Sequence, residues 1–208
     1  MRTRKRTLYG LYLFSLFEGM HFISAVLFTF FANWGGLASK GPITKILLIN
    51  AWFWLWVTIF ETPTGFVADR LGRKTSLLLG CAISISGYII YSSYPSFWVF
   101  LAGDLVLALG VALVSGADSS MVYEICQKEE YTEKRTNTVF SIYKALNIGG
   151  IFVGGLLGSV IQSALGSRYP MLLQTIPVSF AAVVLIFFVS EPAKERFAGN
   201  WLQAVKEG

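Results

Sequence analysis

Ionisable and amide side chains interrupt the long apolar runs of this 208-residue chain at a few positions. Glu18 and His21 lie three residues apart in the first run, and Lys144 and Asn147 have the same spacing in a later one. In a helix, each pair would share one face. A carboxylate in such a place could exchange protons while it meets a cationic substrate. Because ionisable groups are costly inside a membrane, these residues are candidates for function.

Asn50 and Asp104 also lie in apolar runs, and we add them to these four. The predicted substrate or proton site therefore consists of Glu18, His21, Asn50, Asp104, Lys144 and Asn147. Glu18 is the first candidate, since it lies about ten residues from the cytoplasmic end of its run, near mid-bilayer at a rise of about 1.5 Å per residue. Glu18 could instead pair permanently with Lys144 or His21 and serve only helix packing. Asp104 is expected close enough to the outer surface to be solvated.

The elements that position these residues follow from the composition. Hydrophobic residues make up 54% of the chain and charged residues 14%, whereas about 25% of a soluble domain is charged. A membrane helix needs about 20 apolar residues, and six such segments can be placed, near residues 8–32, 45–68, 75–93, 97–122, 137–165 and 170–190. The predicted fold class is therefore an all-α integral membrane protein. A six-helix transmembrane bundle over 1–190 precedes a cytoplasmic amphipathic linker over 191–208.

The distribution of basic residues predicts the orientation. With both termini in the cytoplasm, 13 Lys and Arg residues lie inside and 3 outside, the latter being Lys40, Lys45 and Arg168. The basic residues are scattered at the ends of apolar runs instead of gathering on one polar face. This pattern argues against nucleic acid as a partner and makes the lipid bilayer the expected surroundings.

Metal and enzyme chemistry find little support in the residue types. Cys81 lies in an apolar run and Cys126 in a charged stretch, and neither has neighbours spaced as metal ligands. His21 is the only histidine, and no nucleophile has both a base and an orienting group. We expect no metal, no cofactor and no catalytic residue.

A ten-residue segment between the second and third runs carries a recognisable motif. Residues 65–74 have the form G-x-x-x-D-R-x-G-R-K, with Gly65, Asp69, Arg70, Gly72, Arg73 and Lys74 as its defining members. This segment resembles the signature loop of the major facilitator superfamily. The resemblance covers all six helices and the start of the linker, and it implies that the chain corresponds to the amino-terminal of two six-helix bundles that together enclose a central cavity.

The same resemblance implies a conformational latch. Gly65 and Gly72 are expected to allow close approach and a tight reversal of the chain. In the family, the acid that matches Asp69 and the arginine that matches Arg73 form an ion-pair relay with an acid at the end of the fourth helix. The matching acid here is Glu124, with Asp118 in reserve.

Residues 115–124 resemble the end of the fourth helix in bacterial multidrug and macrolide-efflux-like members. That resemblance implies an inner or plasma membrane location and export of a lipophilic, cationic molecule in exchange for protons. Two departures limit it: Asp104 occupies a position where many proton-coupled members have arginine, and the fifth helix has no Gly-Pro pair. Gly150, Gly154 and Gly158 instead have the four-residue spacing of a close helix-packing face.

The expected function is thus a half-transporter that works by alternating access with a second six-helix bundle, from another chain or a second copy. The alternative is a non-transporting membrane subunit that acts in assembly or regulation. Trp52, Trp54 and Trp56 lie inside the second run, where they could pack against lipid and neighbours or stack on a flat hydrophobic substrate.

Overall fold

The computed structural model describes residues 2–37 and 42–190, and the linker predicted for 191–208 lies outside these residues. All regular elements of the described residues are helices: α1 (Arg2–Gly19), α2 (Leu27–Thr29), the π-helical turn η1 (Phe30–Trp34), α3 (Pro42–Leu71), α4 (Arg73–Tyr91), α5 (Phe97–Lys128), α6 (Glu133–Leu165), α7 (Tyr169–Leu173) and α8 (Thr175–Phe188). Five segments of this part of the chain are long and apolar enough to cross a membrane. The predicted all-α membrane bundle is confirmed.

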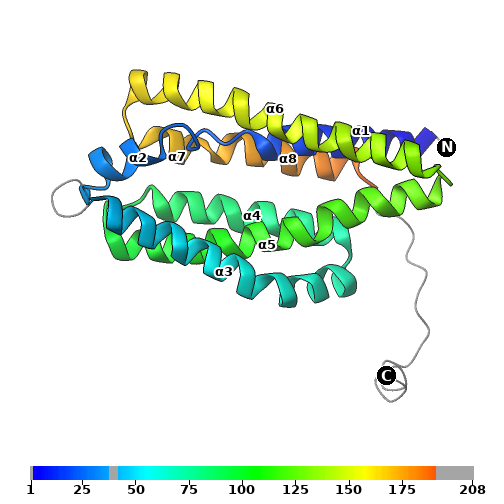
Figure 1. Cartoon of the computed structure of the whole chain (residues 1–208), viewed down its shortest axis with the longest axis horizontal. Coiled ribbons are helices and arrows are strands. Elements are labelled where there is room, and N and C mark those ends of the chain that lie inside the picture. Colours follow the sequence, from blue (N-terminus) through cyan, green and yellow to red (C-terminus); the bar gives the residue numbers. More distant parts are fainter. Residues whose placement is uncertain (1, 38–41, 191–208) are drawn as a thin grey trace, which may run out of the picture.

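The helices form two layers, as Figure 1 shows, with α1, α6 and α8 in one and α3, α4 and α5 in the other. Within the layers, α1 packs on α6 and α8, while α5 packs on α3 and α4. The helix α8 also contacts α4 and so joins the layers. An aromatic cluster closes one end of the bundle, where Tyr91 stacks on Phe100 and both contact Phe30 and Phe31 of the first span.

The first predicted span is not one continuous helix, which corrects the prediction for residues 8–32. Its regular helix ends at Gly19, and residues 20–26 form turns before α2 begins. The fully buried side chain of Gln174 bonds this segment: Phe22 N donates to its Oε1 at 2.6 Å, and its Nε2 donates to the carbonyl oxygen of Met20 at 2.8 Å. Backbone groups that lose their helical hydrogen bonds find no water in a membrane interior. The buried amide of Gln174 takes the place of water here, because it can both donate and accept a hydrogen bond.

The predicted packing glycines of α6 lie against this broken segment. A Cβ on Gly150 would lie 3.0 Å from the carbonyl carbon of Gly19, and one on Gly154 2.7 Å from that of Met20. A Cβ on Gly158 would lie 2.7 Å from the carbonyl carbon of Phe22. These positions therefore bring the backbone of α6 into direct contact with the backbone of the first span.

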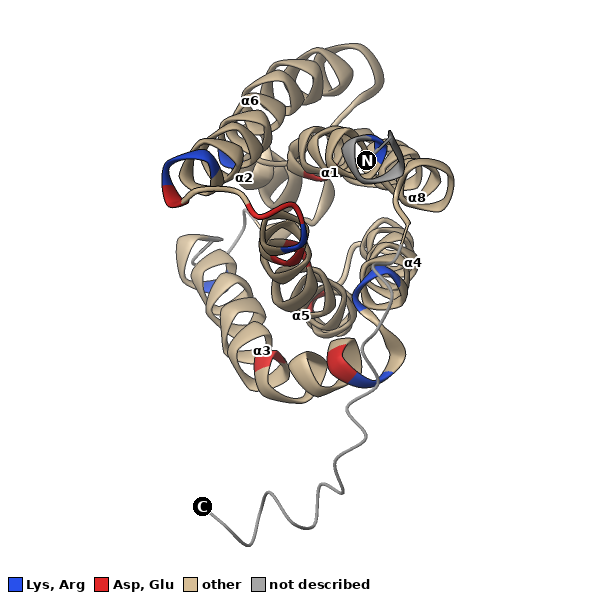
Figure 2. Cartoon of the chain, turned by 90° about the vertical axis from the view of Figure 1, so that its right-hand side faces the viewer, with Lys and Arg blue, Asp and Glu red and all other residues tan. Residues whose placement is uncertain are grey.

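Charged residues gather at one end of the bundle. Figure 2 views this end, where the N-terminus, the α3–α4 junction and the α5–α6 turn lie together. The expected loop over residues 65–74 is almost entirely helical: α3 runs to Leu71, α4 begins at Arg73, and Gly72 alone lies between them with a φ of 100°. Only Gly72 needs the left-handed conformation that glycine allows. Gly65 lies within α3, so its predicted part in the reversal is wrong.

Candidate functional site

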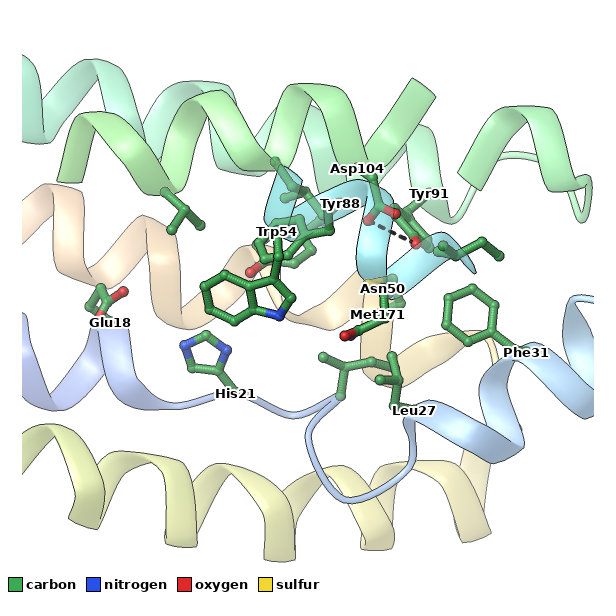
Figure 3. A pocket seen from close by; sticks show the side chains of 15 residues that line it. Glu18, His21, Leu27, Phe31, Asn50, Trp54, Tyr88, Tyr91, Asp104 and Met171 are labelled. Atoms are coloured by element: carbon green, nitrogen blue, oxygen red, sulfur yellow. Dashed lines mark hydrogen bonds between the residues drawn. The ribbon is translucent and has the colours of Figure 1, made fainter. Parts of the chain in front are cut away.

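A cavity of about 300 Å³ lies between the first span and helices α3, α4, α5 and α7. Its polar lining consists of Glu18, His21, Asn50 and Asp104, four of the six residues predicted for the substrate or proton site. Five aromatic side chains line it as well, namely Phe31, Phe53, Trp54, Tyr88 and Tyr91. Figure 3 shows these groups projecting from the different helices into one space.

Glu18 is bonded to a neutral amide at one end of this cavity. Asn147 Nδ2 donates to Glu18 Oε2 at 2.7 Å and to the carbonyl oxygen of Ser15 at 3.2 Å. Lys144, the other residue predicted from α6, lies elsewhere: its Nζ is 3.9 Å from Asp118 Oδ2, and its side chain is 59% exposed. The structure thus brings Glu18, His21 and Asn147 together and directs Lys144 toward α5, so a permanent Glu18–Lys144 pair is wrong.

Glu18 and His21 line the same cavity although the regular helix ends between them. Glu18 occupies the last turn of α1, and His21 lies in the turn segment that Gln174 binds. In an unbroken helix, the backbone groups of Met20 and Phe22 would bond to other backbone groups of the same helix. Here both bond to the side chain of Gln174, which lies between α7 and α8. Sequence reasoning missed Gln174. Its signal was a lone amide between Pro170 and Pro177 in an otherwise apolar run.

Asp104 lies at the other end of the cavity and is only 5% exposed, which corrects the expectation that it is solvated. It is covered because Tyr91 packs across the α4–α5 interface: a Cβ on neighbouring Gly103 would touch the tyrosine ring. The Tyr91 hydroxyl donates to Asp104 Oδ1 at 3.0 Å. Within the described residues, Oδ2 is buried and has no hydrogen-bond partner.

The tryptophans of α3 differ in their surroundings. Trp54 lines the cavity and is 58% exposed. Trp52 donates from Nε1 to the carbonyl oxygen of Leu101 at 3.1 Å and makes an edge contact with Trp56. Trp54 is therefore available to a ligand, while the other two pack within the bundle.

The predicted latch residues meet at the charged end. Arg73 Nη1 forms an ion pair with Glu124 Oε2 at 2.6 Å and donates to the carbonyl oxygen of Ser120 at 2.7 Å. Lys128 binds the other oxygen of Glu124 at 2.7 Å, and Lys74 donates to the carbonyl oxygen of Ile186 in α8 at 3.2 Å. These contacts join the start of α4 to the end of α5 and to α8.

The remaining latch residues lie around this ion pair. Asp69 and Arg70 are exposed in the last turn of α3, where the Arg70 guanidinium lies 4.2 Å from the ring centroid of Phe66. Asp118 faces α6, since its Oδ2 accepts from the Tyr143 hydroxyl at 3.1 Å. The structure thus pairs Arg73 with Glu124, the first candidate, and directs the reserve acid to another helix.

Metal ligation has no site in the part of the chain that the structure describes, where no three His, Cys, Asp or Glu side chains group as metal ligands. Cys81 and Cys126 are buried free thiols. What the site offers chemically is a pair of carboxylates and an aromatic wall around a small space.

Comparison with known proteins agrees with this architecture. The chain is 29% identical over 133 residues to the facilitated glucose transporter member 10 of solute carrier family 2 from Xenopus laevis, covering 62% of the chain and 22% of that protein. It is 26% identical over 150 residues to the inner membrane transport protein YajR of Escherichia coli, covering 71% and 30%. It is 25% identical over 179 residues to the glucose/galactose transporter of Brucella abortus, covering 79% and 42%. The chain thus spans less than half the length of these relatives. Residues 8–206 match the Major Facilitator Superfamily, and the chain therefore belongs to this family of transporters.

Proposed function

We propose that this chain forms one six-helix half of a secondary transporter and moves a small molecule by alternating access with a second bundle. The second bundle is a separate chain, a second copy of this one or a remainder of the same protein. The observation that carries the proposal is the cavity of about 300 Å³, which combines four polar residues with an aromatic wall. Small-molecule sites are typically apolar clefts with a few oriented polar groups.

The proposed substrate is a small lipophilic cation, exported in exchange for protons. A cation is attracted both by carboxylates and by the faces of aromatic rings. The cavity offers Glu18 for the first and Trp54 for the second. Because Glu18 has a neutral amide as its hydrogen-bond donor, its carboxyl group is suited to hold either a proton or the substrate cation. The resemblance of residues 115–124 to multidrug and macrolide-efflux-like members supports export.

A sugar is the second candidate substrate, favoured by the names of two relatives, a facilitated glucose transporter and a glucose/galactose transporter. The Asn50 amide and the Trp54 ring could bind a sugar through its hydroxyl groups and its apolar face. Such a substrate would gain less than a cation does from the negative charge at Glu18. The two candidates therefore differ in how strongly their binding depends on that charge.

We further propose that both termini are cytoplasmic in a bacterial cell membrane, supported by the basic residues at the end that Figure 2 shows. In that orientation the Arg73–Glu124 pair lies at the cytoplasmic face. We propose that this pair, with Asp69, Arg70, Gly72 and Lys74 around the α3–α4 junction, forms part of a latch between transport conformations. Its place beside the only residue between α3 and α4 supports this role.

Ligand binding to the purified chain in lipid nanodiscs tests the substrate proposal. The probes are benzyltrimethylammonium, a permanent aromatic cation, and glucose, each measured by equilibrium dialysis against empty nanodiscs. We expect the cation to bind saturably and Glu18→Gln to weaken it about tenfold, a loss of about 1.4 kcal/mol. Glu61→Gln removes an exposed acid of α3 outside the cavity lining and should change nothing.

The outcomes separate the candidates. Saturable glucose binding without cation binding would replace the cation by a sugar. Cation binding that is equal in the parent and the Glu18→Gln variant would remove Glu18 from the site. Binding of neither probe would favour a non-transporting subunit.

A further inference from the structure

Asp104 lines the cavity with a carboxyl group that has a hydrogen-bond partner, in the described part of the chain, for only one of its two oxygens. Its residue is 95% buried, one oxygen accepts the Tyr91 hydroxyl at 3.0 Å, and the buried Oδ2 has no hydrogen-bond partner among the described residues. A buried carboxylate with a single neutral donor is costly, and native structures seldom leave such an atom unpaired without a purpose. A proton on the carboxyl group, an ordered water or a cation that enters the cavity can each fill this open position.

The surroundings favour a ligand cation as that partner. Among the residues that line the cavity, His21 is the only basic side chain, and it lies on the Glu18 side, away from Asp104. Apart from the amide of Asn50, the labelled side chains on the Asp104 side of the cavity are aromatic or aliphatic, among them Phe31 and Met171. Within this wall, no lysine or arginine is available to neutralise Asp104. Aromatic faces attract an ammonium group most strongly when water is excluded.

The cavity thus has one carboxylate toward each end. Figure 3 shows Glu18 and Asp104 well apart, with the rings of Trp54 and Tyr88 between them in this view. A ligand with one positive charge can satisfy only one of these acids, whereas a ligand with two ammonium groups on an apolar spacer can satisfy both. The aromatic lining suits the spacer, and hydrogen bonds between ammonium and carboxylate are about twice as strong as neutral ones.

We infer that Asp104 forms a second cation-binding subsite, and that the cavity takes a short apolar diamine with one ammonium group at Asp104 and the other at Glu18. This inference rests on the proposed function, because it specifies the ligand class of the same cavity. Asp104 departs from the arginine found in many family members at this position, so the subsite belongs to this chain and cannot be carried over from them.

The test compares para-xylylenediamine with para-methylbenzylamine, which keeps the ring and one amine and replaces the other aminomethyl arm by methyl. Both carry charged amines at neutral pH, and both are measured on the 208-residue chain in nanodiscs by competition with benzyltrimethylammonium. We expect the parent chain to bind the diamine at least about tenfold more tightly than the monoamine. Asp104→Asn should reduce diamine affinity to that of the monoamine, while Glu61→Gln should preserve the difference.

Each result decides a different question. Equal affinity of the parent chain for both amines would overturn the second subsite and leave a single-cation site intact, and this comparison needs no variant. A preference for the diamine that persists in Asp104→Asn, with its helical content checked by circular dichroism, would also overturn it. If neither amine binds, the cation proposal fails together with the inference.

Discussion

Replacing Gln174 by methionine should destabilise the bundle by releasing the broken segment of the first span. Methionine has a similar volume but can neither donate to the carbonyl oxygen of Met20 nor accept from the N–H of Phe22. Gln174 is fully buried at the α7–α8 junction, so no water is at hand to replace these bonds. Both backbone groups would lose their partner in one substitution.

The magnitude follows from these two bonds. A buried polar group left unsatisfied costs about 1–3 kcal/mol, so two groups cost about 2–6 kcal/mol. Membrane proteins fall toward the lower end, because the unfolded chain in the bilayer finds other partners. Gln162 provides a matched control, since its Oε1 accepts only one side-chain bond that the structure describes, from Thr29 Oγ1 at 2.7 Å. Thr29 also donates to the carbonyl oxygen of Val26, so Gln162→Met should cost about 1 kcal/mol or less.

Unfolding in mixed micelles of increasing sodium dodecyl sulfate content, followed by circular dichroism, measures the two free energies. Binding of benzyltrimethylammonium should weaken in Gln174→Met as well, because Glu18 and His21 lose their fixed position beside the cavity. Equal unfolding free energies for the Gln174 and Gln162 variants would refute the idea that Gln174 holds the break.

Three further expectations concern packing, topology and the latch. Gly158→Ala puts a Cβ 2.7 Å from a backbone carbonyl carbon of the first span and should lower the melting temperature. The control Gly149→Ala meets nothing within 4 Å and should leave the melting temperature unchanged or raise it slightly. Equal shifts in the two variants would contradict the close packing. A membrane-impermeant maleimide added to whole cells should label Tyr94→Cys but reach Lys134→Cys only after lysis, and the reverse pattern would invert the topology. Arg73→Gln should cost only about 0–1 kcal/mol of stability, because the ion pair is partly exposed. It should nevertheless slow transport in an assembled transporter, and an unchanged rate would exclude the latch.

Much of the fold was predictable because the bilayer limits the choices. Apolar runs of membrane length, separated by charged stretches, leave helices as the structure available to the chain. The motif at residues 65–74 identified the family before any contact was known. Glu18 could be placed near mid-bilayer because a helix has a constant rise per residue. Its hydrogen bond to Asn147, at 2.7 Å, was not predicted, since the residues expected as its possible partners were Lys144 and His21.

The break at residues 20–26 was not predicted, because the segment has no proline and lies inside a continuous apolar run. Gln174, 152 residues from Phe22, and the glycine face of α6 are what satisfy and surround the freed backbone. The burial of Asp104 was likewise decided by Tyr91 on a neighbouring helix.

The sequence by itself therefore determined the class and the family, because these depend on hydrophobicity along the chain and on a contiguous motif. Only the tertiary structure decided which acids face the cavity and what their partners are. A side chain's surroundings in a helical bundle come from helices distant in sequence, and their packing sets which polar groups remain unpaired.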